Sequence, residues 1–200
     1  MVTLVDQVIR NASRVPWNGT VYRSHGPTWP GDDPGGSLLT SGRWHVGVDS
    51  TSGRPVFPVL YTATSPYVAT WERLRHLDQD SVASIRRGLR MAISRLEVAL
   101  PSVLDLRDPA ALGVPAETFL GDDYEVTQLI ASAAYDEGLA GLLVPTATGV
   151  GAADGDHNVV VFFETTGATK YAFGLAAPGT APRPGVTVSV LGVERPVLPP

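Results

Sequence analysis

The chain has 200 residues, a formal net charge of −5 and a hydrophobic fraction of 44%. Such a chain is long enough for one domain with a substantial core, and it contains no long uncharged apolar run that could span a bilayer. The absence of cysteine excludes disulfides and thiolate metal sites and is typical of cytoplasmic proteins. The acidic balance argues against direct nucleic-acid binding, which needs a basic surface. The first residues show no secretory signal.

In the first half of the chain the residue pattern predicts short helices and strands around one long loop. Apolar spacing over residues 2–12 indicates an amphipathic helix. A segment rich in Gly, Pro, Asp and Ser over residues 26–42 is expected to be a loop, and loops of that length in compact domains are typically binding loops or lids. Ser65 followed by Pro66 is a strong helix start. We expect strands at 21–23 and 58–63 and a helix from 65 to about 77.

The second half is expected to supply most of the sheet. Near-continuous apolar runs at 141–144 and 158–164 predict buried strands. Acidic residues at the start of the segment 122–137, and Gly138 after it, predict a helix. The remaining predicted elements are a helix at 80–89, a strand at 91–100 continuing extended to 106, a helical turn at 109–112, a loop at 148–156 and an edge strand at 186–191 in a Pro-rich tail.

The residues with the clearest chemistry lie between Val21 and Glu72. Within about fifty residues this segment carries Tyr22, Arg23, Arg43, Tyr61 and Glu72. Arginine binds phosphate oxygens in bidentate fashion, tyrosine offers an aromatic face with a hydroxyl, and a carboxylate can hold ribose hydroxyls or stabilise a developing cation. These residue types suit a ligand with phosphates, an aromatic base and a sugar, without the glycine-rich loop of a Rossmann fold.

The order of these pieces resembles the RES domain, a family of bacterial toxins and related proteins named after an Arg, a Glu and a Ser. Arg23 and Glu72 match the first two positions, and Thr146 stands where the family usually has serine. The similarity extends over residues 18–165. It is carried by the segments Tyr22-Arg23, Gly42-Arg43-Trp44, Leu60-Tyr61, Ser65-Pro66, Thr127-Gln128-Leu129-Ile130, Gly141 to Thr146 and Asn158 to Phe162.

The resemblance implies an α+β fold: a single domain with a split mixed or antiparallel β-sheet core flanked by helices, similar to ADP-ribosyltransferases. It divides the chain into an N-terminal helix at 1–17, a RES-like catalytic domain at 18–175 and a Pro-rich C-terminal segment at 176–200. It also implies an enzyme that degrades NAD⁺ by cleaving the nicotinamide–ribose bond through phosphorolysis or hydrolysis. NAD⁺ would then be a substrate, phosphate a possible co-substrate, and no cofactor would be bound permanently.

The family's functional residues map onto this chain one by one. Arg23, Glu72 and Thr146 are the catalytic candidates, with Glu72 stabilising positive charge on the ribose. Arg43 would join Arg23 on the pyrophosphate, and Tyr61, with Tyr22 as the second candidate, would stack on the nicotinamide ring. Asn158 is a further substrate-binding candidate. The family further implies an Xre-like helix-turn-helix antitoxin as partner and a homodimer.

Each candidate also has a purely structural interpretation. Arg43 could pack on Trp44 by a cation–π contact, and Glu72 could pair with Arg75 or His76 on the helix surface. Tyr61 and Tyr22 could be packing aromatics. Threonine keeps the hydroxyl of serine but adds a methyl group, so Thr148 is an alternative donor near the same place.

Three other functions stay open at this point. A protein ADP-ribosyltransferase would use the same residues, and a module that binds a nucleotide or partner without turnover would explain the threonine. A sugar-binding or structural β-rich domain would need neither arginine. The acceptor can be water, phosphate or a protein. No metal site is expected, because His25, His45, His76 and His157 form no ligand pattern and the Gly/Asp loop near 154 lacks the EF-hand order.

Overall fold

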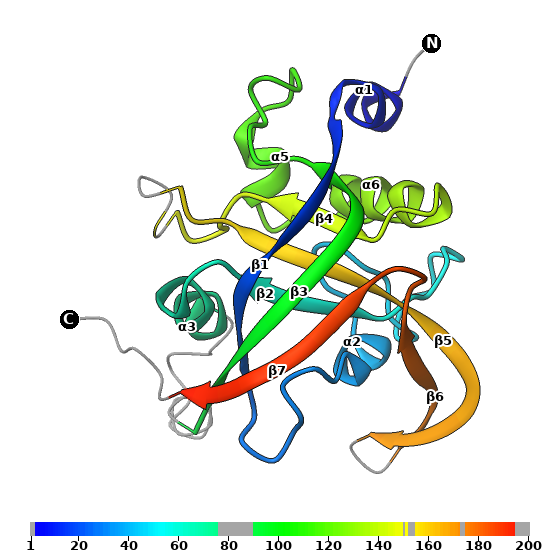
Figure 1. Cartoon of the computed structure of the whole chain (residues 1–200). Helices are drawn as coiled ribbons and strands as arrows, with labels where there is room; N and C mark the ends of the chain where they lie inside the picture. Colours follow the sequence, from blue (N-terminus) through cyan, green and yellow to red (C-terminus); the bar gives the residue numbers. More distant parts are fainter. Residues whose placement is uncertain (1–2, 76–89, 150, 152–154, 173–174, 195–200) are drawn as a thin grey trace.

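A computed structural model describes residues 3–75, 90–149, 151, 155–172 and 175–194. Its elements follow one another as α1 (Leu4–Asn11), β1 (Ser13–His25), α2 (Gly35–Leu39), β2 (Val59–Ala63), α3 (Pro66–Arg75), β3 (Ala92–Asp105), α5 (Ala116–Leu120), α6 (Glu125–Asp136), β4 (Gly141–Val144), β5 (Asn158–Ala172), β6 (Leu175–Pro182) and β7 (Thr187–Glu194) (Figure 1). The predicted helix at 80–89 lies outside the described residues. None of the described helices is long and apolar enough to cross a membrane.

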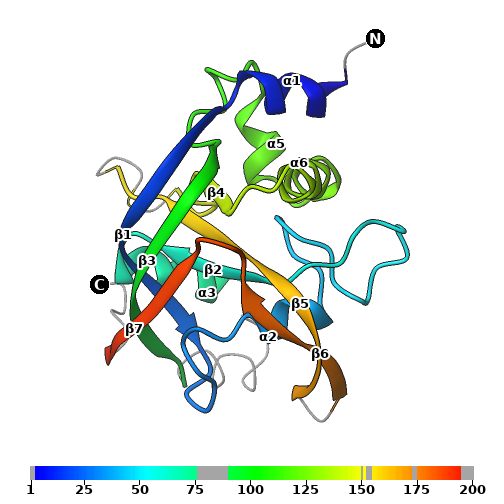
Figure 2. The same cartoon turned by 45° about the vertical axis from the view of Figure 1, so that its right-hand side comes forward.

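The strands form one seven-stranded mixed sheet that closes on itself. Its order is β1-β2-β5-β4-β3-β7, and β1 also pairs with β3, so five strands make a barrel-like ring. Only the β3–β4 pairing is parallel among the described ladders. Figure 2 shows β1 and β3 running side by side, with β7 on the outer side of β3. This arrangement confirms the predicted α+β domain with a sheet core and helices, while the sheet itself is barrel-like.

Two hydrophobic clusters fill the two faces of this sheet because alternate side chains of each strand point in opposite directions. Val160 and Phe162 join the helices α1, α5 and α6 in the larger cluster. Val159 and Val161, their neighbours on β5, join side chains of β1 and β3 inside the ring. β5 is therefore buried on both faces in its first half, as its continuous apolar run predicts.

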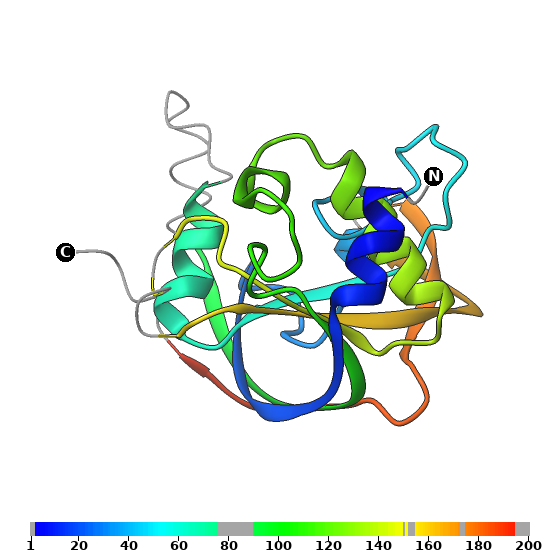
Figure 3. The same ribbon diagram turned by 90° about the horizontal axis from the view of Figure 1, so that it is seen from above.

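The helices lie on different sides of the molecule, with the green segment that leads to α5 between them. Seen from above, α3 (teal) stands on one side, and α1 (blue) and α6 (yellow-green) stand on the other (Figure 3). The start of α3 agrees with the sequence, since the hydroxyl of Ser65 accepts a hydrogen bond from the backbone N–H of Val68 at 3.2 Å. The end of α6 also agrees, because Gly138 takes a positive φ of 83° just after it.

Several elements differ from the prediction. The loop expected at 26–42 contains the five-residue helix α2, and α5 was not predicted at all. β5 continues well beyond residue 164 and forms an antiparallel ladder with β6, which the sequence pattern missed. β6 contains Pro178 and Pro182 and pairs only with β5 among the described strands, so the prolines lie on an edge where a missing N–H is tolerated.

The first and the last described strands, β1 and β7, both pair with other strands of the sheet. β1 begins at Ser13, directly after α1, and extends over thirteen residues. β7 pairs with β3 from Thr187↔Ala99 to Glu194↔Ile93. The Pro-rich segment therefore contributes an edge strand, in the place where residues 186–191 were expected to form one.

Candidate functional site

Glu72 is fixed at the point where three segments meet. It lies on α3, and its Oε1 accepts hydrogen bonds from the backbone N–H of Ala147 at 2.7 Å and from Nδ2 of Asn158 at 2.9 Å. The sheet register brings these donors together, since Asn158 pairs with Ala63 of β2 and with Val144 of β4. The carboxylate is half-buried and held in one orientation, so the surface interpretation, in which it pairs with Arg75, is wrong: Arg75 instead bonds Asp122.

Thr146 directly precedes Ala147, whose N–H binds this carboxylate. Its side chain is buried, with 2% of the residue exposed, and its Oγ1 has no hydrogen-bond partner among the described residues. A buried hydroxyl without a partner is uncommon and costs free energy. Thr148, the alternative donor, has interactions of its own.

Tyr61 presents its ring at the surface while its hydroxyl is anchored. The residue is 36% exposed, and its hydroxyl lies 2.9 Å from both the backbone N–H of Trp44 and Nδ1 of His45. Nε2 of His45 donates to the carbonyl of Thr40 at 2.8 Å, so Nδ1 is the acceptor of the Tyr61 proton. Burial of the hydroxyl strongly raises the pKa of Tyr61. The phenol therefore stays neutral, and its ring is a fixed aromatic face.

Arg43 is buried next to these residues. Its Nη1 donates to the carbonyls of Phe119, at 3.0 Å, and Gly121, and its guanidinium lies 4.6 Å over the ring of Tyr124. The cation–π contact with Trp44 considered above is thus replaced by one with Tyr124. Burial lowers the pKa of Arg43, and the nearby carboxylate of Glu72 acts in the opposite direction. Its Nη2, which carries two N–H donors, is buried and has no partner among the described residues.

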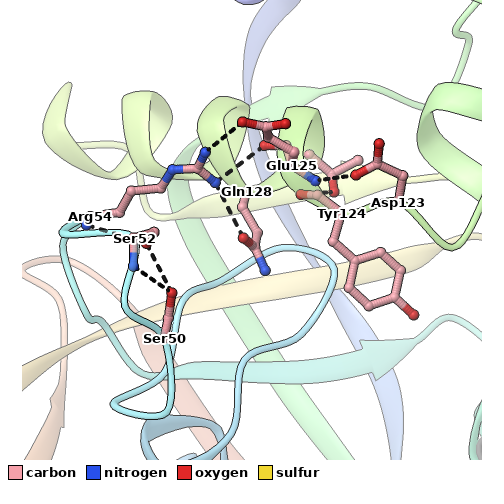
Figure 4. Close-up of polar contacts among 8 residues, drawn as sticks. Ser50, Ser52, Arg54, Asp123, Tyr124, Glu125 and Gln128 are labelled. Atoms are coloured by element: carbon pink, nitrogen blue, oxygen red, sulfur yellow. Dashed lines mark hydrogen bonds and ion pairs between the residues drawn. The ribbon is translucent and has the colours of Figure 1, made fainter.

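A second arginine, Arg54, holds the start of α6, which follows Tyr124, against the loop before β2. Arg54 reaches over the first turn of α6 and bonds the carboxylate of Glu125 and the side-chain oxygen of Gln128, both at 3.3 Å (Figure 4). Gln128 in turn donates to the carbonyl of Gly42 at 3.0 Å. The loop before β2 is thereby fastened to α6 on both sides of Arg43.

Arg23 lies in a different environment from Glu72. It is half-buried, and its Nη1 donates to the carbonyl of Gly31 at 2.9 Å in the loop that follows β1. Burial lowers its pKa to about 10, against the opposing effect of Asp33. A Cβ on Gly31 would lie 2.1 Å from Oγ of Ser94, so the loop approaches β3 as closely as only glycine allows. The described contacts of Arg23 therefore hold this loop.

The seven predicted residues thus divide into groups. Asn158 bonds Glu72, Thr146 precedes a second donor to it, and Arg43 lies within electrostatic range of both Glu72 and Tyr61. Arg23 bonds the 26–34 loop instead, and Tyr22 packs against Ala63, Val68 and Ala69. His45, Tyr124 and Gln128 were not predicted. Only the position of His45 next to Gly42-Arg43-Trp44 could have indicated a role.

A cavity of about 510 Å³ adjoins the site. It shares Thr146 with the site and otherwise lies beyond it, between the start of β1, the end of β3 and the segment before β5. Within the described part of the chain no group of three or more His, Asp or Glu side chains could hold a metal ion.

Comparison with known proteins shows the family of the chain. The family model described as RES domain matches residues 20–173. Curated proteins named NAD(+) phosphorylase MbcT, from Mycobacterium bovis and from two strains of Mycobacterium tuberculosis, are 28% identical to this chain over 142 residues, which is 68% of this chain and 72% of theirs.

The fold is similar to that of a solved structure, described as the crystal structure of the M. tuberculosis MbcT–MbcA toxin–antitoxin complex. The TM-score is 0.60 at 22% sequence identity, and the alignment covers 94% of this chain and 91% of the matched chain. Since the family model spans most of the sequence, the protein belongs to the RES domain family.

Proposed function

We propose that this protein degrades NAD⁺ by cleaving the bond between nicotinamide and ribose, with phosphate as the acceptor. The observation that carries the proposal is the Glu72 carboxylate, which Ala147 and Asn158 hold in one orientation. Thr146, the residue before Ala147, has a buried hydroxyl without a partner among the described residues. The curated relatives, named as NAD(+) phosphorylases, support it as well.

The proposed chemistry follows from the charge that develops during the reaction. Nicotinamide leaves as a neutral molecule, so the ribose carbon passes through a state with positive charge. A carboxylate whose orientation is already fixed stabilises that charge without reorganising. Glu72 would face the ribose, and Thr146 would bind a ribose hydroxyl or the carboxamide. Phosphate then forms a bond to the ribose carbon, and the products are nicotinamide and a phosphorylated ADP-ribose.

The remaining candidates would bind the rest of the dinucleotide. Tyr61 would stack on the nicotinamide ring, because its anchored hydroxyl leaves the ring surface exposed. Arg43 would donate to the pyrophosphate through its free Nη2. Arg23 would join it by exchanging the carbonyl of Gly31 for a phosphate oxygen. An exchange of this kind couples substrate binding to movement of the 26–34 loop.

The similarity to RES proteins is also the basis for the binding mode, partner, oligomeric state and location that we propose. The sheet and its helices would bind the dinucleotide as in an ADP-ribosyltransferase-like fold, without a permanently bound cofactor. The matched structure contains MbcT with an antitoxin, which supports an antitoxin partner for this chain; we propose one of the Xre-like helix-turn-helix type. A homodimer and a cytoplasmic location complete the proposal.

Release of nicotinamide from NAD⁺ in the presence of phosphate tests the function. The Glu72→Gln variant keeps an oxygen that can accept both hydrogen bonds, so the fold should be unchanged. Cleavage should fall by about a hundredfold, corresponding to roughly 3 kcal/mol of barrier. Glu117→Gln, on the exposed surface of α5, is the matched control and should cleave NAD⁺ like the unaltered protein. Equal rates in the two variants would contradict the role of Glu72.

A further inference from the structure

His45 is a buried residue between Tyr61 and the backbone of the loop before β2, and the proposed reaction gives it no role. Only 3% of the residue is exposed. Nε2 of its ring donates to the carbonyl of Thr40 at 2.8 Å, and Nδ1 lies 2.9 Å from the Tyr61 hydroxyl. The two rings also meet edge to face, with their centroids 5.5 Å apart. Both nitrogens of the imidazole are therefore engaged, which fixes the orientation of the ring.

The turn that carries His45 closes tightly around the Tyr61 hydroxyl. Gly42 and His45 pair as a β-bridge, in which the N–H of Gly42 donates to the carbonyl of His45 at 3.2 Å. A Cβ on Gly42 would lie 2.6 Å from Cε1 of His45 and 2.9 Å from the Tyr61 hydroxyl oxygen. Neither distance leaves space for a side chain, so the imidazole and the phenol rest directly on the glycine backbone. The same turn contains Arg43, so it holds one candidate residue and carries another.

The protons at this contact can be assigned from the partners of each atom. The carbonyl of Thr40 only accepts, so Nε2 of His45 carries the proton and Nδ1 offers a lone pair. The Tyr61 oxygen accepts from the backbone N–H of Trp44 at 2.9 Å and donates its own proton to Nδ1. An imidazolium would carry an N–H on Nδ1 as well, so two donors would face the phenol and its proton would lose this acceptor. Only the neutral imidazole, in this tautomer, satisfies the hydroxyl of Tyr61.

The surroundings of His45 keep its imidazole neutral. Burial lowers the pKa of His45 below its ordinary value of 6.5, while the carbonyl of Thr40 and the carboxylate of Asp49 act in the opposite direction. Asp49 itself accepts hydrogen bonds from the backbone N–H and the hydroxyl of Ser41, at 2.8 and 2.6 Å. The phenol of Tyr61, which faces His45 from β2, is neutral as well because burial raises its pKa. The arrangement with an accepting Nδ1 is therefore the one populated at neutral pH.

We propose that His45 is a positioning residue for NAD⁺, acting through the ring of Tyr61. The inference rests on the proposed function, in which this ring stacks on nicotinamide. The O–H bond of a phenol lies in the plane of its ring, so a donor and an acceptor at fixed places set that plane as well as the position of the oxygen. A ring that is oriented before the substrate arrives loses less conformational entropy on binding.

The charge of the substrate decides which kinetic constant responds. The nicotinamide ring of NAD⁺ is cationic, so it is attracted by an aromatic face, and this attraction ends when nicotinamide leaves as a neutral molecule. The contact therefore stabilises bound NAD⁺ at least as much as the transition state. Loss of the contact raises KM and leaves kcat nearly unchanged.

Two substitutions of His45 separate positioning from packing. His45→Asn puts an amide oxygen in the place of Nδ1 and keeps the acceptor, whereas His45→Leu fills similar space without one. With saturating phosphate, we expect His45→Leu to raise KM for NAD⁺ about tenfold while kcat changes by less than about twofold. His45→Asn should restore most of that loss. Equal KM values in the two variants would show that His45 only fills space, and would overturn the proposal.

A double substitution tests whether His45 acts through Tyr61. Tyr61→Phe keeps the ring but removes the hydroxyl that His45 holds, so it should raise KM as His45→Leu does. The protein with both changes should then resemble either single variant, because the two substitutions remove the same contact. Effects on KM that multiply would mean that His45 acts by another route, and would contradict the proposal.

Two measurements without turnover separate this test from the proposed function. The ¹⁵N chemical shifts of the unaltered protein should show a proton on Nε2 of His45 and none on Nδ1, and the opposite tautomer would overturn the assignment. Calorimetric titration with NAD⁺ in the absence of phosphate should give about tenfold weaker binding in His45→Leu than in His45→Asn. If that difference appears but no protein releases nicotinamide, the proposed reaction fails and the role of His45 stands. Equal binding by the two variants, with normal release by the unaltered protein, would overturn the role of His45 alone.

Discussion

A substitution of Thr146 is expected to affect the proposed activity much more than the stability of the fold. Its hydroxyl has no hydrogen-bond partner among the described residues, so replacing it by a methyl group removes no hydrogen bond seen in the structure. We expect Thr146→Val to change the free energy of unfolding by less than about 1 kcal/mol and to lower nicotinamide release by about a hundredfold. Urea unfolding and the nicotinamide assay measure the two effects.

Thr146→Ser is the matched control, since it keeps the hydroxyl and restores the residue usual in the family. It should cleave NAD⁺ at least as fast as the unaltered protein. A Thr146→Val variant that retained full activity would show that the hydroxyl takes no part in the reaction.

A substitution of Arg43 is expected to affect stability, because its guanidinium makes several contacts within the protein. A lysine cannot donate to two carbonyls and stack on Tyr124 at the same time. We expect Arg43→Lys to lower the free energy of unfolding by about 2 kcal/mol, as measured by urea denaturation. A stability equal to that of the unaltered protein would mean that these contacts contribute nothing.

For single residues, the sequence indicated which side chains to consider, but it did not predict which of them contact one another. Glu72 and Asn158 were both candidates, yet the hydrogen bond between them depends on β2, β5 and β4 lying side by side. The cation–π contact considered as an alternative for Arg43 was with its neighbour Trp44, whereas the ring it lies over is that of Tyr124, eighty-one positions further along. Contacts across such separations are set by the fold and leave no local pattern in the chain.

The side chain of Arg183 connects the turn between β6 and β7 to the C-terminal end of α6. Arg183 donates to the carbonyls of Tyr135 and Leu139, both at 2.9 Å, and lies 4.2 Å over the ring of Tyr135. We expect Arg183→Ala to lower the free energy of unfolding by about 2 kcal/mol, since two carbonyls at the end of the helix lose their donor.

Arg95→Ala is the control for that change. Arg95 forms an exposed ion pair with Glu194 at 3.6 Å, and pairs of this kind contribute about 0–1 kcal/mol. Thermal unfolding of both variants gives the comparison. A loss in Arg95→Ala as large as that in Arg183→Ala would contradict this account of the C-terminal segment.

Elements with strong local signals were predictable, and those held by distant contacts were not. Ser65 caps α3 as its sequence predicts, and the apolar runs became β4 and β5. The short helices α2 and α5 have five residues each and no side-chain cap, so their sequences carry no start signal. β6 was missed because its prolines argue against a strand unless the strand is known to lie on an edge.

At the scale of the whole molecule, buried histidines make stability depend on pH. Burial lowers the pKa of His25, His45 and His157 below the ordinary value of 6.5. The folded state therefore binds fewer protons than the unfolded chain in acid. Stability is complete above about pH 6.5 and declines as the pH falls through the lower folded values. Urea unfolding at pH 7.5 and pH 5 should show this loss, and it should be smaller in His45→Asn.

Closure of the sheet is the property of the whole chain that local patterns could not predict. β1 and β3 pair over most of their length although about seventy residues separate them. The resemblance to RES domains correctly implied a sheet with flanking helices, but strand ends that meet to form a ring are determined by twist and long-range pairing. The barrel-like form places the Glu72 site on the outside of the ring, between α3 and α6.

The most direct test of the central claim is a ³¹P NMR time course of the purified protein with NAD⁺ and inorganic phosphate. The account predicts that a new phosphate monoester signal grows in equal amount to the NAD⁺ consumed, and that Glu72→Gln suppresses it. An unchanged NAD⁺ spectrum with folded protein would contradict the account.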